Sequence, residues 1–93
     1  MQYLTPENIT SLLSDIGNTE IRFDIPLPVY ISTEFCLMNI YGVSVDDNNR
    51  LWVNTSRSSE LNVDNTLLYG QYILGVLYDR LKLLCVMKQQ LTK

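Results

Sequence analysis

The last third of the chain most constrains the fold, because it is long, apolar and free of proline. Leucines recur three or four residues apart at 74, 77, 81 and 84, in line with Leu67 and Gly70. This spacing places them along one face of a helix. The alternative is a strand over 66–78, because Tyr, Ile and Val are β-forming and Gly70 and Gly75 weaken a helix, but no turn signal ends such a strand. The spacing predicts one long helix from about 65 to 90.

This helix carries more apolar side chains than the contact with one sheet buries. Two hypotheses account for the excess. An N-terminal helix could pack beside it, or the excess could form an interface with a partner protein or with a second copy of the chain. The candidate interface residues on this helix are Leu68, Ile73, Val76, Leu83, Val86 and Met87.

The beginning of the chain carries the signals of a second, shorter helix. Thr5 is a favourable N-cap, Pro6 suits the first helical position, and Gly17 suits the left-handed residue that ends a helix. Apolar residues follow helical spacing between these signals, at Ile9, Leu12, Leu13 and Ile16. We expect a helix over about 5–16.

The middle of the chain has the patterns of β-strands. Apolar and polar residues alternate over 21–25, and Pro26 and Pro28 then favour a sheet edge or an extended connection. The run 35–41 is apolar on both faces, which suits a central strand. Alternation over 43–45 and 51–54 flanks the segment "DDNN", and this pattern is typical of a hairpin turn.

The adjacent carboxylates Asp46 and Asp47 raise the alternatives of a calcium loop or an acid–base pair. A helix-loop-helix calcium site starting at Asp46 requires Gly at its sixth position and Glu at its twelfth, where this chain has Leu51 and Arg57. Neighbouring side chains of an extended segment also point to opposite faces. We therefore interpret the segment as a turn.

These elements predict a single α+β domain over residues 1–93, in the order α-β-β-β-α. The expected sheet is an antiparallel meander of three to four strands, packed by the helices at about 5–16 and about 65–90. Domains of this outline serve many functions, so the fold class does not select one.

The residue types give little support for catalysis. The chain contains no histidine, and its glycines are too dispersed for a phosphate-binding loop. Its two cysteines, Cys36 and Cys85, lie in separate apolar runs, and we expect both to be buried and reduced. We therefore assign no catalytic, cofactor-binding or metal-binding residue.

The formal net charge is −3, which disfavours binding to nucleic acid. We see no signal peptide and no apolar stretch long enough to span a membrane, so we expect a cytoplasmic protein. The ten acidic residues are scattered along the sequence, although an acidic mimic would gather them on one face.

The favoured function is a non-catalytic protein-interaction module that binds through the long helix, to a partner or to itself. Trp52, with Arg50 and Arg57 nearby, could add to this interface, because Trp and Arg are enriched among the residues that dominate binding energy. Alternatively, Trp52 covers the sheet against a helix. The other functions considered are an acidic inhibitor or mimic of a basic or nucleic-acid-binding protein, and a carboxylate-based enzyme or small-ligand binder.

Overall fold

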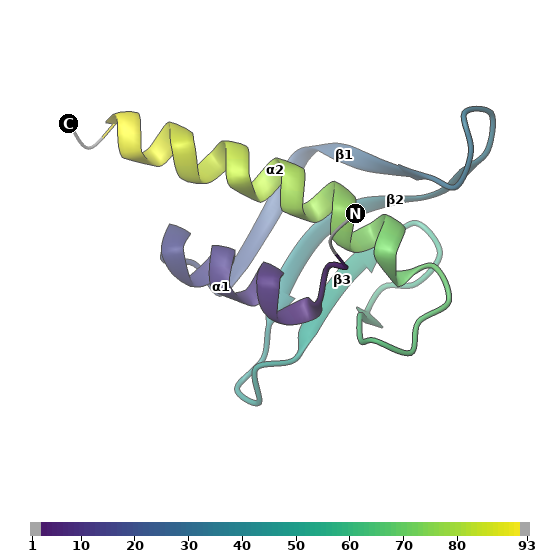
Figure 1. Cartoon of the computed structure of the whole chain (residues 1–93), viewed down its shortest axis with the longest axis horizontal. Helices are drawn as coiled ribbons and strands as arrows, with labels where there is room; N and C mark the ends of the chain where they lie inside the picture. Colours follow the sequence, from purple (N-terminus) through teal and green to yellow (C-terminus); the bar gives the residue numbers. More distant parts are fainter. Residues whose placement is uncertain (1–2, 92–93) are drawn as a thin grey trace.

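The computed structural model describes residues 3–91 and shows an antiparallel sheet with both helices on one face (Figure 1). The strands are hydrogen-bonded in their sequence order, so the sheet is a simple meander. The elements are α1 (Pro6–Ile16), β1 (Glu20–Tyr30), β2 (Cys36–Val45), β3 (Leu51–Thr55), β4 (Leu61–Asn62) and α2 (Gly70–Leu91). The α+β class and the meander are confirmed, with β4 as a short fourth strand.

Helix α1 begins and ends where its signals predict. The Asn8 side chain accepts hydrogen bonds from the backbone N–H and the hydroxyl of Thr5, which fixes the first turn. Gly17 has a φ of 88°, and its N–H donates to the carbonyls of Leu13 and Ser14. Only glycine adopts this left-handed conformation without a steric cost. The chain therefore turns sharply from the helix into β1.

Strand β1 forms one edge of the sheet and passes through both prolines. Its pairing with β2 shifts between Arg22 and Leu27, where four residues of β1 lie opposite Tyr41 alone. Proline lacks the N–H that a strand neighbour would accept, and it is tolerated where that position faces away from the sheet. The edge position predicted for this segment is confirmed.

The turn between β2 and β3 is organised by Asp46. Its carboxylate accepts hydrogen bonds from the backbone N–H groups of Asn48 and Arg50 and from the indole nitrogen of Trp52, at 2.9, 2.9 and 3.0 Å. Asn49 has a φ of 62°, which Asn adopts more readily than most residues. The segment is the predicted hairpin turn.

Helix α2 starts five residues later than the predicted residue 65. Asp64 holds a turn before it, because its carboxylate accepts hydrogen bonds from the backbone N–H and the hydroxyl of Thr66. The Leu67 N–H donates to the Asp64 carbonyl, and the Gly70 N–H donates to the Leu67 carbonyl. The chain becomes helical only after these bonds, and the alternative of a strand over 66–78 is wrong.

The two helices lie side by side and run parallel. At their beginnings, the Gln71 amide accepts a hydrogen bond from the Leu4 N–H and donates one to the Leu4 carbonyl. At their other ends, the Lys88 ammonium donates to the Ile16 carbonyl. These contacts fix which side of α2 faces α1.

The core lies between the sheet and the two helices. Its α2 residues, Ile73, Leu74, Leu77 and Leu81, are buried, and they include most of the leucine row that predicts the helix.

Both cysteines are free, but Cys36 is exposed and Cys85 only half-buried, so the expectation of two buried thiols is wrong. Cys36 is at the first position of β2, one residue before Leu37, where the buried part of the strand begins. Within residues 3–91, neither helix is long and apolar enough to cross a membrane.

Candidate functional site

The side of α2 that points away from the sheet is apolar and uncovered. Tyr72, Leu83, Val86 and Met87 each expose between 47% and 53% of their surface, and Val76 beside them is half-buried. Packing against α1 therefore does not absorb the apolar excess of the helix. We call this surface the outer face of α2, which comprises Tyr72, Gly75, Val76, Asp79, Lys82, Leu83, Val86 and Met87.

Two of the six interface residues that the sequence predicts on the long helix do not belong to the outer face. Ile73 is completely buried in the core, so its assignment to an interaction surface is wrong. It falls on the side of the helix that meets the sheet, and the apolar sequence around it does not reveal that. Leu68 is 96% exposed, but it lies in the turn before Gly70 and is not part of the helix.

Shallow grooves border the outer face on both sides. One, of about 320 Å³, separates α2 from the edge strand β1 and is lined in part by Leu27, Pro28 and Leu83. The other, of about 550 Å³, separates α2 from α1 and is lined in part by Leu12, Lys82 and Val86. The outer face is thus a ridge that a second protein can straddle.

The outer face also contains a glycine that the described structure does not require. A Cβ atom built on Gly75 would meet no atom within 4 Å. Glycine inside a helix costs stability relative to alanine, and no packing contact in the described structure explains its presence here. Gly70 differs, because a Cβ there would contact Leu67 and the Asp64 carbonyl.

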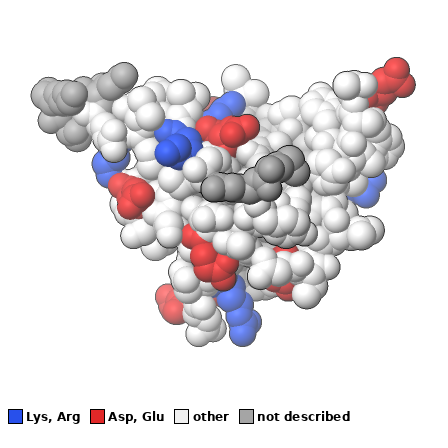
Figure 2. Space-filling model, viewed as in Figure 1, with Lys and Arg blue, Asp and Glu red and all other residues white. Residues whose placement is uncertain are grey.

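Charged groups do not gather on the face of the molecule that carries the helices. Figure 2 shows the acidic and basic side chains of the described residues interspersed over this face, with no patch of one sign. Further carboxylates lie elsewhere, including Glu20 and Glu60 at a hollow on the sheet and Asp46 in the hairpin turn. This distribution gives no support to the hypothesis of an acidic mimic.

The remaining predicted residues lie away from α2. Trp52 is half-buried on the sheet face opposite the helices, since its neighbours Leu51 and Val53 point into the core. It therefore does not cover the sheet against a helix. Arg50 precedes β3 and Arg57 follows it, so the two arginines flank opposite ends of the strand and form no cluster with the indole.

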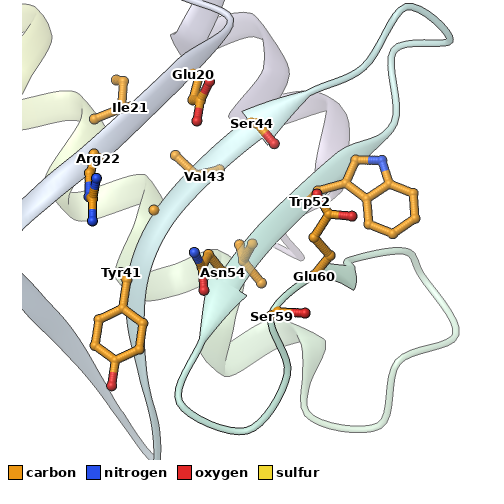
Figure 3. A pocket seen from close by; sticks show the side chains of 12 residues that line it. Glu20, Ile21, Arg22, Tyr41, Val43, Ser44, Trp52, Asn54, Ser59 and Glu60 are labelled. Carbon is orange, nitrogen blue, oxygen red and sulfur yellow. The ribbon is translucent and has the colours of Figure 1, made fainter.

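The sheet face opposite the helices has a polar hollow of about 330 Å³ (Figure 3). Gly42 forms its floor, with Arg22 and Asn54 as its partners on the neighbouring strands. Its acidic residues, Glu20 and Glu60, come from β1 and from the residue before β4, so their backbones lie roughly three strand spacings or 14 Å apart. They lie on opposite sides of the hollow and do not form an adjacent pair (Figure 3).

The described residues also lack other features of a reactive site. Residues 3–91 contain no cluster of His, Cys, Asp and Glu that could hold a metal ion. Hydrogen bonds from Arg50 and Trp52 lower the pKa of Asp46, and bonds from Thr66 lower that of Asp64. Carboxylates with lowered pKa values stay ionised near neutral pH, which suits turn formation and not proton donation.

No protein-family model, curated protein or solved structure matches this chain. The assignment of a site therefore depends on the chain's own surface.

The sequence identifies only part of the outer face. It yields Val76, Leu83, Val86 and Met87 as surplus apolar residues and Gly75 as a point of close approach, but it misses Tyr72, Asp79 and Lys82 as members of the same face. A second row with spacings of three and four residues, at 72, 76, 79, 83 and 86, is present in the sequence. The acidic residue within this row hides it from a search for apolar residues alone.

Proposed function

We propose that this chain is a non-catalytic protein-interaction module whose contact surface is the outer face of α2. One observation carries the proposal: large apolar side chains stay about half exposed on a helix whose opposite side is fully packed. Large apolar surfaces that the fold leaves uncovered are typical of protein–protein interfaces. Aromatic residues and Met are also enriched at such interfaces, and Tyr72 and Met87 provide them here.

The free cysteines support a cytoplasmic location for this module. Cys36 is exposed and unpaired, and such thiols are typical of proteins in a reducing compartment.

The proposal is tested by photo-crosslinking in cells that express the chain. A benzophenone amino acid replaces Leu83 on the outer face, and in a matched control it replaces Leu68, which is also an exposed leucine but lies outside that face. We expect specific protein adducts from position 83 and not from position 68. A second substitution, Val86→Lys, should abolish the adducts from position 83.

The proposal would be contradicted by equal adducts from both positions or by adducts that persist with Val86→Lys. A lack of adducts at position 83 would contradict it as well. Circular dichroism of each variant is the control for folding, and we expect unchanged helix content because the replaced side chains are at least about half exposed.

A further inference from the structure

We propose that the outer face of α2 binds the same face of a second copy of this chain, with the two α2 helices antiparallel. This inference rests on the proposed function. It adds the identity of the partner, which is a second copy of the chain, and the relative direction of the two α2 helices. It follows from the order of charged, small and large residues along the outermost row of the helix, which comprises Gly75, Asp79, Lys82 and Val86.

The charges of this row complement each other when one copy is reversed. An antiparallel pair centred between Arg80 and Leu81 sets Asp79 opposite Lys82 of the second copy, and twofold symmetry repeats the pair. Asp79 has no ion-pair partner among the side chains that the structure describes, so its carboxylate is available. The Lys82 ammonium lies at the same surface, 5.9 Å from the centroid of the Tyr78 ring.

The side-chain sizes complement each other in the same alignment. It sets Gly75 opposite Val86 of the second copy, so that a branched side chain meets the position without a side chain. Leu83 then lies close to Val76 of the second copy. Small residues allow two helix backbones to approach closely, which accounts for a glycine that has open space around it in the single chain.

Other alignments and surfaces fit a second copy less well. A parallel pair, or an antiparallel pair centred on Asp79, sets the two Asp79 carboxylates against each other, and like charges oppose association. The edge of the sheet at β1 does not suit strand addition, because Pro26 and Pro28 lack N–H groups for a new strand.

The paired surface is small. The outer face between Tyr72 and Val86 spans roughly 21 Å of helix at 1.5 Å per residue, and a contact of this length buries an area at the lower end of the range for stable interfaces. Side chains entering the bordering grooves would add buried area on both sides. We therefore expect a reversible dimer with a dissociation constant on the order of micromolar.

The first experiment measures self-association of the purified chain by sedimentation equilibrium over a wide concentration range. Asp79→Lys should weaken the dimer about tenfold, because it replaces two attractive contacts with two repulsive ones. The double variant Asp79→Lys/Lys82→Asp restores the complementarity in reverse and should recover the wild-type affinity. Asp47→Lys makes the same charge change in the exposed hairpin turn and should have little effect.

The second experiment tests the alignment by disulfide formation in a Cys36→Ser/Cys85→Ala background. Gly75→Cys/Val86→Cys should form a covalent dimer under mild oxidation, since residues opposite each other in a close helix pair can meet the distance limits of a disulfide. The two positions are eleven residues apart on one helix, so they cannot pair within one chain. Gly75→Cys alone should stay monomeric.

These experiments separate the failure of this inference from the failure of the proposed function. A wild-type chain that is monomeric at every concentration, or a double charge variant no tighter than Asp79→Lys, overturns self-pairing. Adducts with other proteins from position 83 would still support the interaction module. A covalent dimer of Gly75→Cys alone would overturn the antiparallel alignment.

Discussion

Both sides of α2 carry large apolar side chains, but they differ in what surrounds those side chains. On the inner side, Ile73, Leu77 and Leu81 pack between the sheet and α1 and are fully buried. On the outer side, Leu83 and Val86 have the same kind of side chain and stay about half exposed. The comparison shows that an apolar residue on a helix does not by itself indicate the core. Its position relative to the neighbouring elements decides whether it stabilises the fold or is available to a partner.

The largest expected effect is the difference in the free energy of unfolding when one leucine is truncated on each side of α2. Leu77→Ala should destabilise the fold by about 2–5 kcal/mol, because it leaves a cavity in a packed core. Leu83→Ala should change the free energy of unfolding by less than about 0.5 kcal/mol, because its side chain faces solvent. Urea denaturation at low protein concentration measures both values without a contribution from association. Equal losses would show that the outer side is structural.

Smaller effects on stability are expected when two glycines are replaced by alanine, and the two replacements should act in opposite directions. Gly75→Ala should stabilise the unassociated chain by roughly 0.5–1 kcal/mol, because alanine favours a helix and a Cβ has open space there. Gly42→Ala should destabilise it by roughly 1 kcal/mol, because its Cβ would lie 3.1 Å from the Ile21 carbonyl oxygen in the neighbouring strand. The thermal unfolding temperature of each variant, compared with that of the wild-type chain, distinguishes the two effects. Destabilisation by Gly75→Ala would mean that the glycine serves the fold.

The smallest effect concerns the other uncovered surface, the sheet face with Trp52. The Trp52 indole donates a hydrogen bond to the Asp46 carboxylate, which fixes its position. The apolar side chains of the outer face have no such hydrogen bond. Because the pKa of Asp46 is lowered in the folded state, its ionisation stabilises the fold above the ordinary value of 3.8. This contribution disappears as the pH falls through the lowered pKa.

Asp46→Asn should therefore lower the unfolding temperature slightly at pH 7 and have almost no effect at pH 2. Thermal unfolding at both values, followed by Trp52 fluorescence, measures the difference. An equal loss at both pH values would mean that ionisation of Asp46 does not contribute to the turn.

Features that depend on local sequence are predicted well. Thr5, Pro6 and Gly17 define the limits of α1, and Asp46 with Asn49 produces the hairpin turn, because each acts through its own backbone torsions or nearby hydrogen bonds. The start of α2 is less predictable. It depends on whether the hydrogen bonds that Asp64 accepts are more favourable than helix formation in the next residues, and the propensities of those residues do not decide that.

Features that depend on distant residues are predicted poorly. The burial of Ile73 and the exposure of Leu83 follow from how α2 is rotated about its axis, and contacts with the other end of the chain set that rotation. Gln71 binds Leu4, and Lys88 binds Ile16. In the sequence these partners are 67 and 72 residues apart, so no local pattern reveals them.

The same long-range contacts have a consequence during synthesis on the ribosome. The strands of the meander pair with their neighbours in the sequence and can pair as they emerge, but α2, one half of the helical cover, is made after all of them. Until α2 has left the exit tunnel, α1 lacks its parallel partner, and the apolar side of the sheet is open to other nascent chains. The chain therefore exposes its largest apolar surface after the strands are made and before α2 packs on them.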